Sequence, residues 1–427
     1  MIRRPFFGFL KPKLKVLQVD ENLQTIQDIP LPPRITLTVK NPHLHPENLA
    51  LSTGNKVRTG QKIILTDHDT DYLISTATGT IAEISEVTSY LGQTFTTISI
   101  DTKDDEPDEE FAECMQSPRN KTALDFFNQL PGAPEFSSMV SFDPPINKII
   151  VTGIDRDLLV ATNQYILDRE FNTAAEGIPI LKDMTSVGQI KIVVPSAFTH
   201  GSENGLDIVH LDPIYPDTLP GMLVRNVFKE TVPQKKTPKD IGIGFVTAET
   251  VYCLAKAYKE KKIPTNKLIT VIRQNGSISI ARARIGTPVG HILDFLEISV
   301  STGDKVVLGG PMTGHTIHSL DAPISYDTDS IMVQKAEDIV LSSDTYCFNC
   351  GECIRVCPVK IPVNMLIRLL ENGFYEEAAD QYDLLCCIEC GLCSYVCMGH
   401  IPVFHYIMLG KHELAKTHNS SEETNVR

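Results

Sequence analysis

The feature that most constrains this chain is a pair of cysteine runs near its C-terminus, each with the spacing C-x2-C-x2-C-x3-C. The two runs are Cys347, Cys350, Cys353 and Cys357, then Cys387, Cys390, Cys393 and Cys397. In proteins that hold two [4Fe–4S] clusters, the fourth cysteine of such a run ligates the other cluster. The sequence therefore predicts two metal sites, one formed by Cys347, Cys350, Cys353 and Cys397, the other by Cys387, Cys390, Cys393 and Cys357.

Zinc binding and disulfide bonding are the alternatives for so many cysteines. Zinc sites usually show paired C-x2-C knuckles rather than a double run with this spacing. Disulfides need a bridging geometry that such dense runs do not provide, and the N-terminus does not resemble a secretory signal. The pattern thus favours an iron–sulfur electron carrier.

Three of the eleven cysteines lie outside the two runs. Cys386 directly precedes Cys387 and could replace it as a ligand, but only Cys387 keeps two residues before Cys390. Its role stays open. Cys114 and Cys253 stand alone, and we expect both to be small buried apolar side chains.

Charge and length limit the classes of function. At 427 residues the chain is long enough for two to four domains. Its net charge of −14 argues against nucleic-acid binding, which needs clustered Lys and Arg. Eight acidic residues gather between Asp101 and Glu113. We expect a solvated linker there, with docking of a basic partner as the alternative.

No stretch reaches the roughly 18 apolar residues that span a bilayer. The N-terminal residues 1–14 combine basic side chains with Phe6, Phe7 and Phe9. They could lie on a membrane surface or clasp a partner, but a packed or disordered arm is favoured. We therefore expect a cytoplasmic chain that is peripheral to a membrane through other subunits.

The order of periodic segments predicts an α/β multidomain protein. Alternating β segments flank G-x-x-V-x-x-G-Q (Gly54–Gln61), a pattern typical of a barrel-sandwich hybrid (lipoyl-like) domain, but no Lys occupies the second hairpin tip. Buried strands at βαβ spacing follow, which indicates a Rossmann-like α/β domain. An Asn275–Gly276 hairpin, a short helix and a further strand favour a β-grasp unit. The cysteine runs, separated by helices, form a helical two-cluster module of the ferredoxin type.

The expected boundaries follow from these patterns: 1–32 N-terminal arm, 33–100 barrel-sandwich domain, 101–118 acidic linker, 119–262 Rossmann-like domain, 263–335 β-grasp domain, 336–412 two-cluster module and 413–427 flexible tail.

Taken together, the parts resemble a known family. I-G-T-P (Ile285–Pro288), G-G-P-M-T-G (Gly309–Gly314), Tyr215–Pro216 and C-I-E-C-G-L-C-S-Y-V-C (Cys387–Cys397) are similar to signatures of the RnfC family, which belongs to the Rnf electron transport complex. That family is related to the flavin-bearing NADH-oxidising subunit of respiratory complex I. The resemblance covers roughly residues 30 to 410.

The resemblance implies a peripheral protein on the cytoplasmic face of the inner (plasma) membrane. Such a protein passes electrons from NADH through FMN and two [4Fe–4S] clusters to membrane subunits, with coupling to ion transport. The β-grasp unit would be the soluble-ligand-binding (SLBB) domain of that family.

The flavin loop departs from the family pattern. The family's G-x-G-G-A-G-F-P loop corresponds here to Asn128–Ser138, which keeps only Gly132 and contains Pro131 and Pro134. Proline lacks the amide donor that a phosphate cradle needs. The acidic turn is altered to T-G-I-D-R-D-L (Thr152–Leu158), and Met398 replaces the proline after the last cysteine. Intact FMN binding and NADH oxidation are therefore disfavoured, while the clusters are expected to be retained.

Three functions remain. The favoured one is an electron-transfer subunit of an Rnf-like membrane complex, which receives electrons from a ferredoxin, a cytochrome or another dehydrogenase subunit. The second is an FMN-dependent NADH-oxidising subunit with a divergent loop. The third is a non-redox scaffold with structural clusters.

Overall fold

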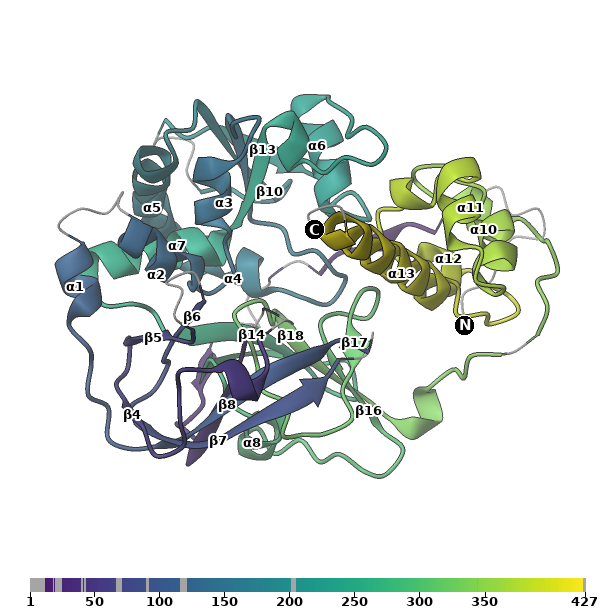
Figure 1. Ribbon diagram of the computed structural model, residues 1–427. Coiled ribbons are helices and arrows are strands. Elements are labelled where there is room, and N and C mark those ends of the chain that lie inside the picture. The colour runs from purple at the N-terminus through teal and green to yellow at the C-terminus, as the bar shows by residue number, and fades with distance from the viewer. Residues whose placement is uncertain are drawn as a thin grey trace.

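The computed structural model describes residues 12–424 apart from 18, 20–24, 40, 42–43, 67–70, 90–91, 116–120, 201–204 and 344. The chain is mixed α/β and contains several separate sheets. Figure 1 shows a large body of sheets and helices, beside which the C-terminal helices form a smaller lobe. Residues 1–11, which include the apolar part of the expected arm, lie outside the described residues.

The first unit, which we call the N-terminal sheet unit, is built from short antiparallel strands. Its main sheet has the order β3-β8-β7-β4, beside the hairpin β5-β6. In β3, Ile35 and Leu37 are buried and alternate with more exposed residues, the period of two expected for a half-buried strand, whereas β8 is buried continuously from Thr96 to Ile100. The strands are β3 (Arg34–Thr38), β4 (Lys56–Val57), β5 (Lys62–Ile64), β6 (Tyr72–Ile74), β7 (Gly79–Thr88) and β8 (Thr94–Thr102).

The tip of the hairpin after β6 is buried rather than presented to solvent. The Thr76 hydroxyl donates to the carbonyl oxygen of Ile285 at 2.6 Å, and Arg284 donates to the Thr76 carbonyl at 2.8 Å. This contact fixes the N-terminal sheet unit to the six-stranded sheet that contains Arg284. It indicates a structural role for the tip, which carries no lysine.

The second unit, the parallel-sheet unit, holds a four-stranded parallel sheet with the order β11-β10-β9-β13. Its strands are apolar runs such as Ile149–Val151, because helices cover such sheets on both faces. The strands are β9 (Lys148–Thr152), β10 (Gln189–Pro195), β11 (Ile208–Leu211) and β13 (Ile243–Thr247). The helices from the preceding segment onward are α1 (Glu110–Cys114), α2 (Lys121–Asn128), α3 (Phe136–Ser141), α4 (Thr162–Arg169), α5 (Phe171–Thr185), α6 (Pro220–Phe228) and α7 (Ala248–Glu260).

The third unit, the mixed-sheet unit, has the strand order β17-β16-β18-β14-β15-β2. Asn275 and Gly276 form the turn between β14 and β15, with Gly276 at φ +79°. The edge strand β2 (Ile26–Asp28) comes from the segment that the sequence placed in the arm, as does β1 (Leu14–Lys15), which pairs with β12 (Ile214–Tyr215). The other elements are β14 (Asn266–Ile272), β15 (Ile278–Arg284), α8 (Val289–Phe295), β16 (Lys305–Leu308), β17 (His315–Thr316) and β18 (Ser330–Gln334).

A buried ion cluster joins the second and third units. Lys267 of β14 is fully buried, and its ammonium contacts the carboxylates of Glu249 on α7 and Asp329 before β18. Burial lowers the pKa of Lys267, but the two carboxylates outweigh it and raise the pKa above the ordinary value. Removing one partner would leave a buried charge uncompensated, so the cluster holds the two units together.

The smaller lobe, which we call the cysteine module, spans residues 345–424. Its helices are α9 (Glu352–Val356), α10 (Val363–Leu370), α11 (Tyr375–Gln381), α12 (Leu392–Tyr395) and α13 (Val403–Thr424). Its apolar core includes Leu366, Ile367, Leu384 and Ile407 together with several of the cysteines. Short 3-10 helices occur at Pro46–Asn48, Lys239–Ile241, Ala336–Asp338 and Leu384–Cys386.

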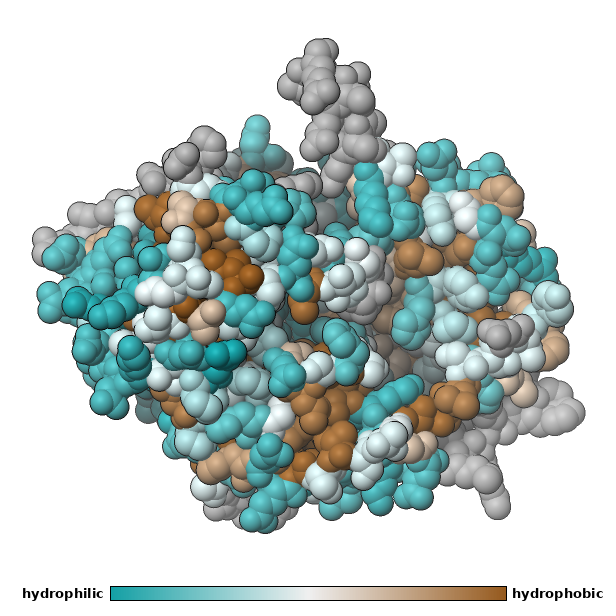
Figure 2. Space-filling view, turned by 60° about the horizontal axis from the view of Figure 1, so that its bottom comes forward, coloured by the Kyte–Doolittle hydropathy of each residue, from teal (hydrophilic) through white to brown (hydrophobic). Residues whose placement is uncertain are grey.

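Among the described residues, none of the helices combines the length and the apolar character needed to cross a bilayer. The face shown in Figure 2 carries separate brown, apolar patches between broad hydrophilic areas.

Candidate metal centres

The two cysteine runs fold as two copies of one loop. In each copy the residue before the second cysteine has a left-handed backbone, at φ +55° for Asn349 and +57° for Glu389. A glycine with positive φ follows that cysteine, at +73° for Gly351 and +69° for Gly391. A short helix then begins and carries the third cysteine, α9 in one copy and α12 in the other. The equal backbone geometry means that both loops present their thiols in the same way.

The repeat continues past the cysteines. Each copy has another left-handed residue, Lys360 at φ +61° and His400 at +53°, and each is followed by the sequence Ile-Pro-Val. The valines begin α10 and α13, and each valine amide donates to the isoleucine carbonyl two residues earlier, at 2.9 and 2.8 Å. Sequence reasoning missed this internal repeat, although the recurring Ile-Pro-Val could have shown it.

Most of the eight run cysteines are withdrawn from solvent. Cys353, Cys357, Cys390 and Cys393 are buried, whereas Cys350 is exposed. The remaining three are intermediate, namely Cys347, Cys387 and Cys397. All eleven cysteines of the chain are free thiols. Cys253 is buried on α7, as expected for a small apolar side chain, whereas Cys114, expected to be buried as well, is only partly buried.

Electrostatic interactions show which thiols lie near one another. The pKa of Cys353 is raised to about 11, mainly by burial and in smaller part by the neighbouring Cys347 and Cys350. Burial likewise raises the pKa of Cys390 to about 12, with additional contributions from Cys387 and Cys357. Cys347 and Cys350 of run one therefore lie near Cys353, and Cys357 lies near Cys390. The assignment of Cys357 to the second cluster remains a prediction from the spacing.

The two groups of thiols adjoin. Burial raises the pKa of Cys393, and the nearby charges include Cys387, Cys390 and, from the first run, Cys353. Cys397 packs against the same apolar core as Cys347. Its part in the first group remains a prediction from the spacing.

No three Cys, His, Asp or Glu side chains in the described part of the chain are close enough to share one metal ion. A four-iron cluster makes a different demand, because each of its four thiolates binds its own iron.

Backbone amides point at the sulfur atoms. The amide of Glu389 donates to Cys387 Sγ at 3.4 Å. The amides of Ile354, Leu392 and Ser394 lower the thiol pKa of Cys353, Cys390 and Cys393 in the same way. Such N–H donors stabilise the thiolate form that binds iron and adjust the reduction potential of a bound cluster.

A lysine from α13 lies beside the second run. Lys411 donates to the carbonyl oxygen of Cys387 at 2.7 Å and to the Glu389 carboxylate at 2.6 Å. Its positive charge opposes the burial that raises the pKa of Cys386 and of Cys387. A positive charge therefore lies close to Cys387 of the second run and to Cys386, which precedes it.

The second loop is seated on the body of the protein. The buried Tyr215 hydroxyl donates to the carbonyl oxygen of Cys390 at 2.6 Å. Gly391 lies against the mixed-sheet unit, since a Cβ there would come within 2.6 Å of the Met312 carbonyl oxygen. Ile388 packs toward Gly221 at the start of α6. The parallel-sheet and mixed-sheet units therefore both contact this loop.

The acidic turn after β9 positions the loop that meets Gly391. The Asp157 carboxylate accepts from the amides of Met312 and Thr313 and from the Thr313 hydroxyl, at 2.8–3.2 Å. Gly310 has no room for a side chain because Asp157 occupies that space. Asp157 thus links the turn after β9 to the second cysteine loop through Met312.

The segment that would cradle a flavin phosphate is occupied by contacts within the chain. The Gly132 amide donates to the Tyr326 carbonyl at 2.7 Å, and the Ala133 amide donates to the Leu130 carbonyl at 3.0 Å. A side chain at position 132 would overlap the hydroxyls of Thr247 and Thr250. The loop therefore lies directly on the N-terminus of α7. The amides of Gly132 and Ala133 already donate to carbonyl oxygens within the chain.

The polar groups next to this loop also have hydrogen-bond partners within the chain. Within α7, the amide of Thr250 donates to the Thr247 hydroxyl and that of Glu249 to the Asn163 side chain. Asp155 is buried and accepts from the amides of Asn163 and Gln164. The cavity left at this end of the parallel sheet has about 310 Å³, and the ion pair of Lys239 and Glu135 forms part of its wall. These residues do not fit the phosphate cradle of a flavin.

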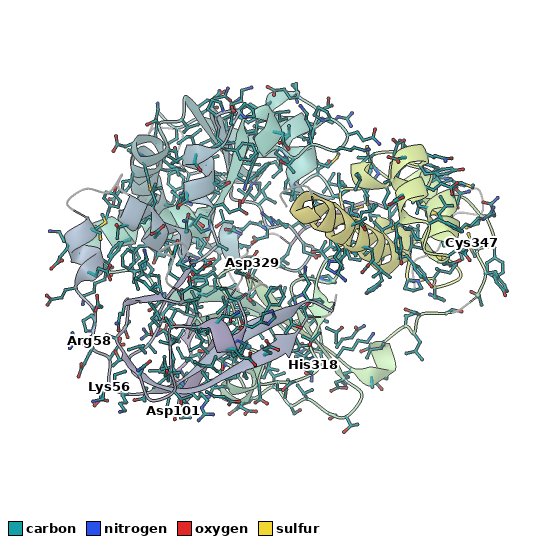
Figure 3. All side chains as sticks on the ribbon, in the orientation of Figure 1. Lys56, Arg58, Asp101, His318, Asp329 and Cys347 are labelled. Carbon is teal, nitrogen blue, oxygen red and sulfur yellow. The ribbon has the colours of Figure 1, made fainter. Side chains whose placement is uncertain are left out.

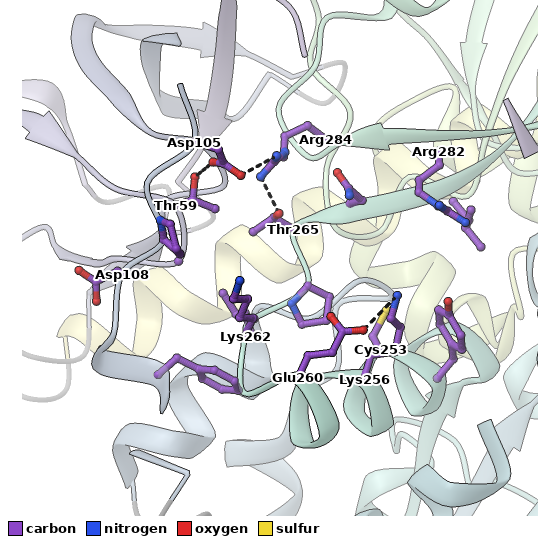
Figure 4. Close-up of a pocket in the computed structure, with 18 of the residues that line it drawn as sticks. Thr59, Asp105, Asp108, Cys253, Lys256, Glu260, Lys262, Thr265, Arg282 and Arg284 are labelled. Carbon is purple, nitrogen blue, oxygen red and sulfur yellow. Dashed lines mark hydrogen bonds and ion pairs between the residues drawn. The ribbon is translucent and has the colours of Figure 1, made fainter. Parts of the chain in front are cut away.

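Two further cavities lie between the units. One of about 420 Å³ has four acidic and four basic side chains in its wall, with Asp105 paired to Arg284 and Lys256 to Glu260 (Figure 4). This pairing places Asp105 of the acidic segment against the mixed-sheet unit. The other, of about 700 Å³, lies between β3, the turn at Arg156 and the residues before β18.

Comparisons with known proteins agree with the sequence resemblance. No family model matches the chain. The C-subunit of the proton-translocating ferredoxin:NAD(+) oxidoreductase complex of Clostridium ljungdahlii is 24% identical over 385 residues, which cover 84% of this chain and 83% of that protein. The C-subunit of the ion-translocating oxidoreductase complex of Pectobacterium carotovorum is 25% identical over 401 residues, which cover 88% and 53%. Its counterpart in Buchnera aphidicola is 24% identical over 269 residues, which cover 60% and 57%.

These relatives confirm the resemblance to the RnfC family. The chain spans most of the clostridial relative but only little more than half the length of the other two. Among solved structures, the air-oxidized NAD+-reducing [NiFe]-hydrogenase has a TM-score of 0.42 and 12% identity. The match covers 62% of this chain and 55% of the hydrogenase chain. The H2-reduced form has a TM-score of 0.41 and 14% identity, and covers 73% and 63%.

Proposed function

We propose, from the resemblance to the C-subunits of ion-translocating oxidoreductases, that this chain is an iron–sulfur electron-transfer subunit of a membrane-associated redox complex. In this role it relays electrons through two [4Fe–4S] clusters to membrane subunits, with coupling to ion translocation. The proposal does not include a flavin, because the residues after Asn128 do not offer a cradle for the flavin phosphate.

The observation that carries the proposal is the position of Cys357. It belongs to the first run in sequence, yet its buried side chain packs in the same apolar cluster as Cys387 and Cys393 of the second run. An exchange of the fourth cysteine between runs is the ligand pattern of two adjoining clusters. Zinc knuckles would not need it.

In the proposed assignment, the residues that hold the two clusters are Cys347, Cys350, Cys353 and Cys397 for the first, and Cys387, Cys390, Cys393 and Cys357 for the second. The bound clusters supply one-electron transfer. The protein contributes buried thiolates, amide donors such as that of Glu389, and the positive charge of Lys411 beside the second site. The second site faces the body of the protein, whereas the first site includes the exposed Cys350.

We further infer that the units correspond to the domains expected from the sequence. The N-terminal sheet unit would be the barrel-sandwich hybrid, the parallel-sheet unit the Rossmann-like domain, and the mixed-sheet unit the β-grasp (SLBB) domain. The four-stranded parallel order and the Asn275–Gly276 hairpin support these assignments. The partners would be other subunits of the complex and a protein electron donor, on the cytoplasmic face of the inner membrane.

A second candidate is an NADH-oxidising subunit that binds FMN in an altered loop. The name of the clostridial relative, which belongs to a ferredoxin:NAD(+) oxidoreductase complex, favours it. The engaged amides of Gly132 and Ala133 weigh against it.

Anaerobic purification followed by assays of iron, acid-labile sulfide and flavin tests these functions together. About eight irons, no flavin and no reduction by NADH are expected, with EPR signals that dithionite induces. One FMN per chain and cluster signals induced by NADH would establish the second candidate. Clusters that no reductant changes would indicate a structural scaffold.

A further inference from the structure

Three large apolar side chains lie exposed around the first cysteine loop. Tyr346 is 90% exposed, Phe348 72% and Met398 63%. The exposed Cys350 belongs to the same loop as Phe348. We call Tyr346, Phe348, Cys350 and Met398 the Cys350 face. Figure 3 shows the labelled Cys347, which follows Tyr346, toward the outer edge of the cysteine module. Exposed apolar residues are ordinary when single, but a group of them marks an interaction site.

The Cys350 face is formed by two segments that hydrogen bonds hold side by side. The Ser343 amide donates to the His400 carbonyl at 3.0 Å, and the Thr345 hydroxyl donates to the Gly399 carbonyl at 3.2 Å. A Cβ on Gly399 would lie 3.5 Å from the Phe348 ring. Phe348 of the first run and Met398, which follows the second run, are thereby brought to the same face.

A hydrogen bond from α10 holds the first cysteine loop in place. The Asn364 side-chain amide at the start of α10 donates to the Asn349 side chain at 2.8 Å. Asn349 lies between Phe348 and Cys350, so this bond fixes the part of the loop that carries both. The exposure of Phe348 and Cys350 is therefore a feature of an ordered loop.

The second cysteine loop shows what covers the equivalent face. There Ile388 occupies the position of Phe348 and packs toward Gly221, and Cys390 occupies the position of Cys350 and is only 7% exposed. Tyr215 donates to the Cys390 carbonyl. In the second copy, then, an apolar wall and a hydroxyl donor from this same chain cover the loop. In the first copy, the same face is bare among the described residues.

We propose that the Cys350 face is the docking surface for a separate protein that carries an iron–sulfur cluster close to its own surface. That partner would present an apolar wall to Phe348 and a donor to the Cys350 carbonyl, as the parallel-sheet unit does for Ile388 and Cys390. The inference rests on the proposed function, since docking here is useful only if Cys350 ligates a redox centre. One electron would pass per encounter, so that one of the two clusters is oxidised as the other is reduced.

The chemistry of the Cys350 face favours a partner protein with its own redox centre. It is an exposed ligand of a redox centre framed by aromatic and thioether side chains, and electron transfer requires the two centres to approach closely without water between them. Weak, transient redox encounters bury little surface, so a face as small as this one is large enough for them. Aromatic residues and Met are enriched at the cores of protein interfaces.

The test is the double variant Tyr346→Ser/Phe348→Ser of the full chain, loaded with clusters. The probes are a reduced bacterial two-cluster ferredoxin and reduced methyl viologen, and stopped-flow absorbance follows cluster reduction. The matched control is Phe374→Ser, which changes an exposed aromatic residue directly before α11, outside the Cys350 face. With ferredoxin, the second-order rate constant is expected to fall by about tenfold or more in the double variant and to stay unchanged in the control. With methyl viologen, all three proteins should react equally.

Several results would overturn the inference. One is an equal ferredoxin rate in the double variant and the wild type; another is a wild-type protein that methyl viologen reduces but ferredoxin does not. If the double variant turns a wild-type dimer into a monomer without changing the ferredoxin rate, the face binds a second copy of this chain instead. Failure of methyl viologen to reduce iron-loaded wild type would count against the proposed function itself, which separates the two failures.

Discussion

The Tyr215 hydroxyl donates a 2.6 Å hydrogen bond to the carbonyl oxygen of Cys390, although the two residues lie 175 positions apart. Tyr215 is buried at the end of β12, and burial raises the pKa of its hydroxyl, so it stays a neutral donor. This bond joins the parallel-sheet unit to the loop that carries the second cysteine run. Several properties of the protein depend on this junction and can be measured.

Replacing Tyr215 by Phe should destabilise the seating of the second loop. The variant leaves a carbonyl oxygen without its donor, which costs about 1–3 kcal/mol. We expect lower resistance to denaturant together with an altered EPR spectrum of one cluster only. Tyr326→Phe is the matched control, because its hydroxyl also donates to a backbone carbonyl, that of Ile74, far from the cysteines. An unchanged cluster spectrum in Tyr215→Phe would show that the bond has no influence on the site.

The exchange of the fourth cysteine can be tested by iron content. Cys357→Ala should lose about half of the iron, and the lost EPR signal should be the one that Cys387→Ala also removes. Cys386→Ala should retain both clusters, because only Cys387 has the required spacing. Unchanged iron in Cys387→Ala, or full loss in Cys386→Ala, would reverse this assignment.

Gly391 and Gly351 form a matched pair for testing the contact with the mixed-sheet unit. Both have positive φ, so alanine costs about 1–2 kcal/mol of backbone strain at either position. Only at Gly391 would the new Cβ meet the Met312 carbonyl, whereas Gly351 has open space. Gly391→Ala should therefore unfold at lower denaturant than Gly351→Ala and expose the module to limited proteolysis. Equal behaviour of the two variants would exclude a tight contact at Met312.

Lys411 is expected to raise the reduction potential of the second cluster. Its ammonium lies at the Cys387 carbonyl, and a nearby positive charge favours the reduced, more negative state. Lys411→Met should lower one midpoint potential by on the order of tens of millivolts, and Lys411→Arg should restore it. Lys416→Met removes a lysine that pairs with Glu413 on the same helix and should change neither potential. Redox titration followed by EPR measures both.

Stability should depend on pH through Asp155. Burial raises its pKa to about 6, although amide donors from Asn163 and Gln164 act against the shift. The ordinary value is about 3.9, so between these pH values the folded chain holds a proton that the unfolded chain has lost. This contribution to stability is complete below pH ~4 and disappears as the pH rises through ~6, by roughly 2–3 kcal/mol. Asp155→Asn should remove that part of the slope when denaturant curves are compared across this range. Parallel curves for variant and wild type would contradict it.

Much of the fold class could be predicted because its signals are local. The mixed α/β character is confirmed, and Asn275–Gly276 forms the expected turn. Strands β1 and β2 were not predicted, since two or three residues show no periodicity and gain their hydrogen bonds only from β12 and β15. The expected acidic linker also contains the end of β8 and the helix α1.

The candidate site also has one part that the sequence predicts and one part that it does not. The spacing of the cysteines follows from the chain order, and so does the expectation that Cys357 joins the second run. The partners of Asp157, by contrast, lie more than 150 residues later, at Met312 and Thr313. No local pattern connects positions so far apart.

By itself, the sequence determined the chemistry that the chain can carry. Thiol type and spacing are properties of a few consecutive residues, and the missing amides at Pro131 and Pro134 are covalent facts. Only the tertiary structure decided how two almost equal loops differ. Packing of the parallel-sheet unit covers Ile388 and Cys390, whereas Phe348 and Cys350 are left exposed. Burial depends on which distant surfaces meet, and that is set by the packing of whole units rather than by the residues of either loop.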